Sequence, residues 1–562
     1  MAISDARRSL RLYAEETWRR FYRRVALGRM TAFRFSGMAP DRLIVAPTDL
    51  RIADRHIAEE IYAGRFPLAG QVFDTFGASP FISDLPSEEF AERLHSFRWL
   101  RHLRAANHEL AFANGRALVD EWISVHGRRM TGIGWRPDII AERTIAWLSH
   151  SPIVLKGADH GFYRRFLRSL ALQIRYLRHI APTTIDGEVR LRVRIALAMA
   201  TLAMPASPST IRSAARNLDH EMDRQILPDG GHVSRNPQVI LDLLADLLPL
   251  RQTYINLGQS LPKRLIPGID RMFPALRFFR HSNGELALFN GATAVSADRL
   301  LCVLRYDEST GRTFRAAPHM HYHRLECSQT VVIADTGRPP PGVLSQRAHA
   351  GCLSFEMSSG RNRYVVNAGV PVAAASQFGA LSRSTAAHSG LILNDTSSAR
   401  QSQSHFLGPI IVGGIRSVTS QRIDSDEGAQ GFSARHDGYL SRFGLIHERE
   451  IRLNAEGDRI TGRDRLLRTG DKDPKAEDAS LAIVRFHIHP KISVGQTSDG
   501  AILLTAADGE KWLFSSIDAR PAIEESIFLA DLTGPRKTRQ ITLSFTVGSC
   551  PEIQWQLIRR PE

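Results

Sequence analysis

The hydrophobic pattern of the chain changes once, near residue 273, and this change limits the possible folds more than any other feature. Before it, apolar residues recur at the i, i+3, i+4 and i+7 positions of amphipathic helices. The expected helices cover residues 52–62, 88–103, 109–124, 137–148, 162–180, 189–204, 210–225 and 237–257, with short Gly, Pro or Asp clusters between them. Successive antiparallel helices of this length predict an α-solenoid or an α/α toroid.

Beyond residue 273 the apolar runs become short, and turns rich in Gly, Pro and Asn separate them. The expected strands cover residues 276–280, 286–289, 300–305, 330–334, 353–357, 364–367, 391–393 and 555–558. Many short strands without intervening helices predict an antiparallel β-sandwich. The sequence therefore predicts a multidomain α and β protein. Its expected parts are a basic N-terminal extension (1–48), an α/α toroid domain (49–272) and a β-sandwich domain (273–562).

The charge of the chain suits an anionic partner. The 562 residues carry a formal net charge of +15, and 66 of the 73 basic residues are Arg. The planar fork of Arg binds carboxylate, sulfate and phosphate groups in pairs of hydrogen bonds. Nucleic acid, anionic lipid and acidic glycan all fit such a balance, and so does a merely solvated surface. No nucleic-acid-binding module is recognisable, so no nucleic-acid partner is expected.

The first segment, residues 7–29, predicts a basic amphipathic helix. Its apolar residues are Leu10, Trp18, Phe21, Tyr22 and Val25. Such a helix attaches to an anionic membrane, or it docks on its own domain with the Arg side chains outside. No signal peptide is visible, and the longest apolar stretch, residues 195–206, is too short to span a bilayer. The sequence predicts a cytoplasmic protein without a transmembrane segment, and it leaves the oligomeric state open.

Several motifs together resemble the heparinase II/III-like polysaccharide lyases. They are LPDGGH (227–232) followed by Arg235 and Pro237, HAGCLSF (349–355), TAAHSG (385–390) and RHDGYLSRFGLIHERE (435–450). The resemblance covers essentially the whole chain. It implies an incomplete α/α toroid followed by antiparallel β-sheets, with an active-site cleft between them. It also implies cleavage of an acidic, uronate-containing glycan by β-elimination. The alternative is a catalytically degenerate glycan-binding or envelope-associated protein of the same fold, in the periplasm or cell envelope.

β-Elimination needs a group that neutralises the uronate carboxylate, a base for the C5 proton and an acid for the leaving oxygen. The resemblance implies that His232, His349 and Tyr439 transfer protons. The expected substrate-binding residues are Arg235, Arg383, His319 and His321. On a regular strand, His319, His321 and His323 would share one face and line the cleft.

Two positions depart from the pattern of the lyases. Val239 stands where relatives commonly have a Tyr, and Glu188 stands where they often have a neutralising Asn. A Glu cannot neutralise a carboxylate unless it is protonated.

Some relatives hold zinc, and the corresponding histidines here are His349 and His388. The expected acidic ligand corresponds to Asn367, and Gly351 replaces an Asp. Zinc is therefore possible, although two His and an amide make a weak ligand set. The alternative is a pair of hydrogen-bonded histidines within the sheet.

Overall fold

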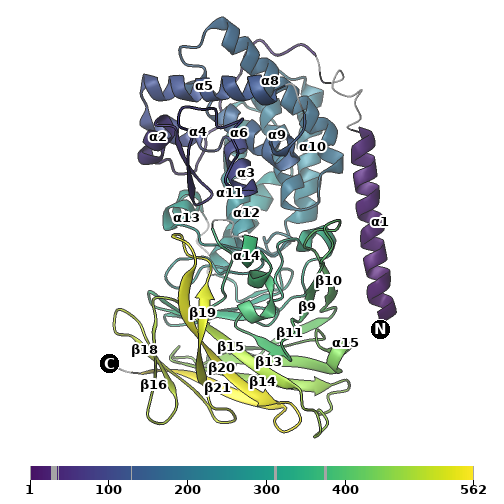
Figure 1. Ribbon diagram of the computed structural model, residues 1–562, viewed down its shortest axis with the longest axis vertical. Coiled ribbons are helices and arrows are strands. Elements are labelled where there is room, and N and C mark those ends of the chain that lie inside the picture. The colour runs from purple at the N-terminus through teal and green to yellow at the C-terminus, as the bar shows by residue number, and fades with distance from the viewer. Residues whose placement is uncertain are drawn as a thin grey trace.

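The computed structural model describes residues 2–26, 35, 37–127, 130–308, 313–372 and 376–560. Helices form the upper half of the molecule in Figure 1, and β-sheets form the lower half. The helices are α1 (Ala2–Ala26), α2 (Arg55–Tyr62), α3 (Glu88–Ser96), α4 (Leu100–Ala106), α5 (Glu109–His126), α6 (Pro137–Ser149), α7 (Ser151–Val154), α8 (His160–Ile180), α9 (Glu188–Ala203), α10 (Pro208–Gln225), α11 (Pro237–Asn256), α12 (Leu265–Phe278) and α13 (Ala297–Leu304), with the short α14 (Ser376–Gly379) and α15 (Leu440–Phe443) in the lower half.

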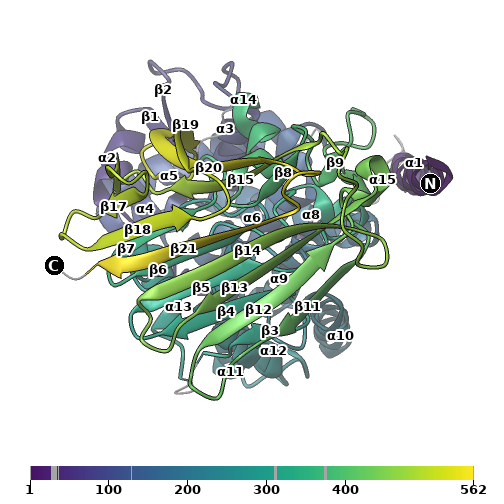
Figure 2. The same ribbon diagram turned by 90° about the horizontal axis from the view of Figure 1, so that it is seen from below.

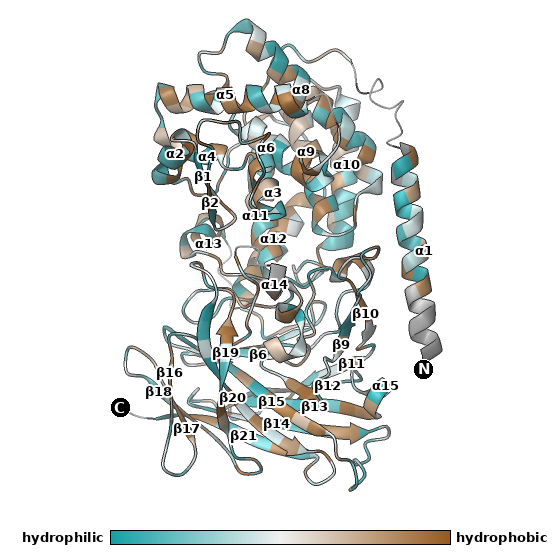
Figure 3. Ribbon diagram, in the orientation of Figure 1, coloured by the Kyte–Doolittle hydropathy of each residue, from teal (hydrophilic) through white to brown (hydrophobic). Residues whose placement is uncertain are grey.

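The predicted helical segments are confirmed, with one division. Residues 88–103 form two helices because Phe97 adopts a left-handed conformation (φ 57°) that ends α3. Polar N-caps fix several starts: Ser87, Asp159, Ser207 and Asn236 each accept a hydrogen bond from a backbone N–H in the first turn. Figure 3 shows hydrophobic and hydrophilic positions alternating around these helices, as amphipathic packing requires.

The β half contains two large sheets. One has the order β11-β12-β13-β14-β21-β18-β17-β16, and the other has the order β19-β20-β15-β7-β6-β5-β4-β3, with β8 also paired to β15. Figure 2 shows β12, β13, β14, β21 and β18 side by side. The strands are β1 (Arg65–Leu68), β2 (Gln71–Asp74), β3 (Ala316–Ala317), β4 (Tyr322–Cys327), β5 (Thr330–Asp335), β6 (Phe355–Ser359), β7 (Asn362–Val366), β8 (Leu391–Leu393), β9 (Ala399–Gln401), β10 (Ile411–Gly414), β11 (Val418–Arg422), β12 (Gln430–His436), β13 (Leu445–Leu453), β14 (Arg459–Arg468), β15 (Leu481–Ile488), β16 (Ser493–Gln496), β17 (Ile502–Thr505), β18 (Lys511–Ser516), β19 (Ala522–Phe528), β20 (Arg536–Thr546) and β21 (Glu552–Arg560).

The antiparallel sandwich is confirmed, but the first three expected strands are wrong. Residues 276–280 include the end of α12, and residues 300–305 largely form α13. Residues 286–289 are not a strand and contribute only a bridge from Leu286 to Arg280. In α13, Leu300 and Val303 are buried while Leu301 is exposed, which is the period of a short helix capped by Ser296. Helical structure thus continues to Leu304, past the boundary expected near residue 273.

A buried carboxylate on β14, Asp464, connects the two sheets. It accepts hydrogen bonds from Arg449 Nε (2.8 Å), His447 Nε2 (2.8 Å) and Trp555 Nε1 (3.0 Å). Arg449 also donates to two backbone carbonyls that lie next to strands of the other sheet. The charges of Arg449 and His447 hold the pKa of Asp464 far below its ordinary value, although burial alone would raise this pKa.

We expect Asp464→Ala to lower the free energy of unfolding by about 3–5 kcal/mol, because it leaves the buried Arg449 charge without its carboxylate. Urea unfolding measures this loss. The matched control is Asp473→Ala, since Asp473 forms an exposed ion pair with Arg465. It should cost no more than about 1 kcal/mol. Equal losses in both variants would contradict the role given to Asp464.

Candidate functional site

A cavity of about 420 Å³ lies at the junction of the helical half and the β half. The starts of α6, α9 and α11 form one wall, at residues 136–139, 186–189 and 236–239. The opposite wall comes from residues 343–348, which belong to a loop of the β half. The cavity thus occupies the position expected for the cleft.

The charged groups in the cavity lining balance one another. The lining contains the cations Arg19, Arg93, Arg136, Arg192, Arg299 and Arg347, and the anions Glu92, Asp138, Glu142, Asp186, Glu188 and Asp242. The described lining therefore has no excess of positive charge that would favour an anionic partner.

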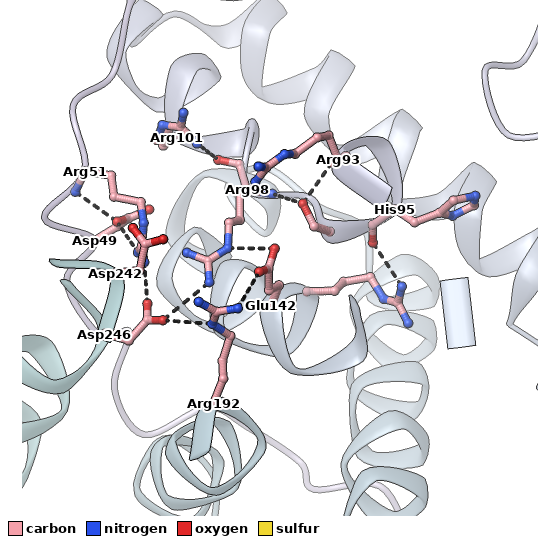
Figure 4. A network of polar contacts seen from close by, with 12 residues as sticks. Asp49, Arg51, Arg93, His95, Arg98, Arg101, Glu142, Arg192, Asp242 and Asp246 are labelled. Atoms are coloured by element: carbon pink, nitrogen blue, oxygen red, sulfur yellow. Dashed lines mark hydrogen bonds and ion pairs between the residues drawn. The ribbon is translucent and has the colours of Figure 1, made fainter. Parts of the chain in front are cut away.

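Figure 4 shows a network of ion pairs, and Glu142, Arg192 and Asp242 of this network belong to the cavity lining. Arg192 contacts both Glu188 (2.6 Å) and Glu142 (3.1 Å). Asp246 pairs with Arg51 at 2.6 Å. Burial alone would raise the pKa of Glu142 and of Asp246, but the surrounding Arg charges lower each to about 2. These acids are ionised at neutral pH, so the arginines that they bind are already neutralised.

Glu188 itself faces the cavity as an anion. Burial works to raise the pKa of Glu188, but the charges of Arg192 and Arg347 outweigh it and hold this pKa below its ordinary value. An ionised carboxylate repels the carboxylate of a uronate. Glu188 thus lacks the neutralising ability that elimination requires at this point of the cleft.

The LPDGGH turn, residues 227–232, brings the helical half against the β half. Gly230 has a φ of 84°, and a Cβ there would lie 1.9 Å from the carbonyl oxygen of Arg271. A Cβ on Gly231 would lie 1.8 Å from the sulfur of Met320. Only glycine fits at position 230, and a side chain at position 231 would require Met320 to move, so packing explains both glycines.

His232 lies beneath the cavity and is 1% exposed. Its Nδ1 is 2.8 Å from Ser234 Oγ, and its Nε2 is 3.0 Å from Gln225 Oε1. Burial lowers its pKa to about 4, against the opposing charge of Glu188. Ser234 belongs to the described lining and His232 does not. Both ring nitrogens of His232 are thus engaged within the protein, in the neutral form.

The two expected substrate-binding arginines are buried. Arg235 pairs with Asp335 and donates to the carbonyl oxygens of Met320 (2.8 Å) and His321 (3.1 Å). Arg383 donates to carbonyl oxygens at residues 348 and 345, each at 2.8 Å. Both guanidinium groups therefore hold loops of the β half rather than extend into the cavity.

His319 and His321 lie in the turn between β3 and β4, and both are exposed. The backbone N–H of His319 donates to Asp229 at 2.8 Å. Only His323 lies on the strand, where it is buried and stacks on Phe432. The expectation that these three histidines share one strand face is wrong, because the chain reverses direction between them.

Tyr439 is buried in the sandwich core, 1% exposed, and its hydroxyl donates to the carbonyl oxygen of Leu391 at 2.7 Å. Burial raises its pKa far above the ordinary value. The structure does not bring this phenol to the cavity with His232 or His349.

His349 and His388 are buried against each other, with Nδ1 and Nε2 2.9 Å apart. His388 Nδ1 lies 2.7 Å from the carbonyl oxygen of Ser384, so His388 Nε2 is the acceptor of the pair. A Cβ on Gly351 would lie 2.7 Å from His388 Cδ2, which leaves no space for an aspartate. Asn367 Oδ1 accepts from the N–H of Ser389 at 3.1 Å.

These residues do not fit a zinc ion. A tight site needs three or more deprotonated ligands with free lone pairs. Within the described ranges, no group of three or more His, Cys, Asp or Glu side chains is placed to hold a metal. His388 Nε2 accepts the hydrogen bond from His349, so of these two histidines only His349 Nε2, which has no hydrogen-bond partner, could offer a lone pair to an ion. The geometry matches the hydrogen-bonded histidine pair that stood as the alternative.

The cavity uses residues that the sequence analysis did not select, among them Asn236, Gln238, Asn290 and Arg347. Asn236 precedes a proline at a helix start, and Asn290 belongs to an FNG turn. An Asn before a proline is explained as a helix cap and an FNG sequence as a turn, so neither pattern indicates a functional site. Arg347 is 75% exposed and differs in no local way from the many other arginines.

Comparisons with known proteins fit this architecture. Residues 309–556 match the family model described as heparinase II/III-like, C-terminal. FtsZ-localized protein C of Caulobacter vibrioides is 30% identical over 538 residues, which cover 92% of this chain and 91% of that protein. A crystal structure of heparinase III superposes with a TM-score of 0.72 at 14% identity, covering 94% of this chain and 88% of that one. Heparan sulfate lyase HepC from Pedobacter heparinus gives a TM-score of 0.58 at 14% identity, covering 94% and 87%.

The fold is thus that of the toroid-and-sandwich polysaccharide lyases, with an incomplete α/α toroid before the antiparallel sheets. The chain belongs to the heparinase II/III-like family. None of its described helices combines the length and apolar character needed to cross a membrane.

The buried histidines predict a loss of stability in weak acid. The folded-state pKa values of His232 and His388 are about 4, below the ordinary value of 6.5. As pH falls below 6.5 the unfolded chain takes up protons first, so stability is complete above 6.5 and declines toward pH 4. We expect His232→Gln and His388→Gln each to reduce this slope by about 1 kcal/mol per pH unit.

Urea unfolding at pH values of about 4.5 to 7 measures these slopes, because this range lies roughly between the folded-state and unfolded-state pKa of each histidine. His56→Gln is the control, because the side chain of His56 is 91% exposed. It should keep the wild-type slope. Unchanged slopes in both buried variants would show that these imidazoles are not held neutral by the fold.

Proposed function

We propose that this protein uses the heparinase fold to bind a glycan and does not cleave it, the alternative function that the sequence left open. One observation carries the proposal: the described cavity lining contains no His and no Tyr. Elimination needs a base for the C5 proton and an acid for the leaving oxygen, and His and Tyr are the groups that the sequence predicts for these two roles. His232, His349 and Tyr439 are buried. His232 and Tyr439 bind protein partners, and His349 Nε2, which has no partner, lies outside the described lining.

The balanced lining favours a ligand rich in hydroxyl and amide groups over a polyanion. Carboxylates accept hydrogen bonds from sugar hydroxyls, and Arg donates to hydroxyl and carbonyl oxygens. Six acidic side chains match the six arginines of the lining, so the lining has no net positive charge to attract uronate and sulfate groups. We therefore propose a neutral, N-acetylated glycan in place of the acidic polysaccharide expected from the sequence.

The competing function is β-elimination of an acidic glycan, which the fold and the position of the cavity support. Purified protein incubated with heparan sulfate and other uronate polymers should give no ultraviolet absorbance from unsaturated product. A signal that disappears in His232→Ala would overturn the proposal, because it would show that this buried histidine reaches substrate.

Binding is tested by calorimetric titration with N-acetylglucosamine oligomers and with heparan sulfate oligomers. We expect the neutral oligomers to bind more tightly. Arg347→Ala should weaken this binding about tenfold, or about 1.4 kcal/mol. Arg536→Ala is the control, since Arg536 is exposed on β20, outside the described lining. Tighter binding of the heparan sulfate oligomers would contradict the proposal and show that the ligand is an acidic glycan.

The similarity to FtsZ-localized protein C extends over nearly the whole chain. We propose on this basis that the protein also localises with FtsZ, and that it resides in the cytoplasm. A fluorescent fusion expressed in the native host should coincide with labelled FtsZ. A diffuse signal, or recovery of the protein in the periplasmic fraction, would contradict this location while leaving the glycan proposal to its own tests.

A further inference from the structure

Helix α1 turns its apolar residues away from the protein. Leu10 is 72% exposed, Trp18 68%, Phe21 58%, Tyr22 52% and Val25 63%. At 100° per residue these five side chains occupy an arc of about 120° on one side of the helix. We call this arc the apolar stripe of α1. In a surface helix of a globular protein such a stripe normally faces the core.

The opposite face of α1 holds the helix on the body through Tyr13 and Arg20, which contact Phe406, and through Leu12, which packs against a small apolar cluster. Glu16 is 8% exposed and pairs with Arg19 and Arg20, at 2.6 Å each. Arg20 also donates to the carbonyl oxygen of Phe406 at 2.6 Å and lies over its ring. Tyr13 stacks on the same ring, with centroids 5.8 Å apart. The helix therefore docks as expected, but with its apolar side chains outside.

This orientation follows from specific contacts on the docked face. Rotating the apolar stripe inward would break the contacts of Arg20 and Tyr13 with Phe406. The stripe is thus available to another surface while α1 stays in place. A contiguous exposed apolar patch of this kind marks an interaction site.

The charge of the chain indicates which kind of partner binds the apolar stripe of α1. Residues 1–34 contain nine Arg against three acids, and the whole chain has a net charge of +15. Arg11 and Arg24 are exposed on the same helix. A second copy of the chain would bring another strongly basic surface against this one. Anionic lipid head groups instead attract the arginines, whose alkyl stems extend along the apolar stripe.

We propose that α1 binds the surface of an anionic membrane, with Trp18, Phe21 and Val25 inserted at the boundary between head groups and acyl chains. Trp and Tyr favour this boundary because their rings are apolar and their polar atoms stay hydrated. The helix lies in the plane of the interface and does not cross it. This inference is independent of the proposed glycan binding.

The position of α1 also sets the orientation of the molecule. It lies along one side of the body, beside both halves (Figures 1 and 2), and contacts residues 181–183 of the helical half and β10 of the β half. The membrane therefore runs along the long side of the molecule. Arg19 belongs both to α1 and to the cavity lining, so the cavity lies next to the bound membrane.

Vesicle co-sedimentation of the full chain tests the proposal. The protein should bind vesicles with about one third phosphatidylglycerol and should leave pure phosphatidylcholine vesicles unbound. Raising the salt concentration should weaken this binding, because screening reduces the attraction between Arg and lipid. Failure to bind the anionic vesicles, or equal binding to both kinds, would overturn the proposal.

Trp18→Glu/Phe21→Glu should lower the affinity at least tenfold without changing the unfolding temperature, since both side chains are exposed. Phe76→Glu is the matched control, because Phe76 is 91% exposed on another part of the surface. Wild-type binding by the double variant would overturn the assignment, and so would an equal loss in the control. A dimer, seen by sedimentation velocity and lost in the double variant, would assign the stripe to a second copy instead.

Trp18 also reports its own insertion. The chain has seven Trp, and the six others, Trp99, Trp122, Trp135, Trp147, Trp512 and Trp555, are at most 2% exposed. Lipids brominated on their acyl chains should therefore quench Trp18 alone when vesicles bind. Trp18→Phe should bind with nearly wild-type affinity and show no quenching. Binding of the wild type without quenching would refute insertion of the stripe.

Discussion

The arrangement of the two halves depends on a buried ion pair between Arg235 and Asp335. Arg235 enters α11 from the helical side with a φ of 60°, a conformation that costs energy unless the surroundings fix it. Its guanidinium then binds two carbonyl groups of the β3–β4 turn. Asn290 donates to Asp335 at 3.0 Å and to the hydroxyl of Tyr322 at 2.7 Å. Because the cavity walls come from both halves, this junction determines the shape of the cavity.

The helical half could be predicted well because the apolar period of a long helix is visible in its own residues. Each of the long helices repeats its apolar stripe over several turns, and polar caps mark the starts. A short apolar run does not repeat its pattern, so the period cannot be read from it. Residues 300–305 have too few positions to separate a period of 3.6 from a period of 2, so α13 could not be distinguished from a strand. Only the structure shows that the segment is a helix, because Leu300 and Val303 are buried and Leu301 is exposed.

The orientation of α1 was beyond the sequence for a different reason. The pattern established that the helix has two unlike faces, but not which face meets the protein. Docking depends on Phe406, which is 386 residues away from Arg20 in the chain. The tertiary contact reverses the usual preference, because Phe406 binds Arg20 and stacks on Tyr13, both on the face opposite the apolar stripe. Such a preference is invisible until distant segments are brought together.

The histidines of the motifs that resemble the lyases are explained by their hydrogen bonds within the fold, without a catalytic role. His232 connects Gln225 at the end of α10 to Ser234 before α11, so the LPDGGH turn needs an imidazole there for hydrogen bonding. His388 accepts a hydrogen bond from His349 and is fixed by the carbonyl group of Ser384, while His349 Nε2 is buried without a partner. A neutral imidazole that both donates and accepts within the core is already a sufficient reason for these residues. Reactivity toward a ligand has to come from the groups in the cavity lining, and its polar groups are carboxylates, arginines, amides and hydroxyls.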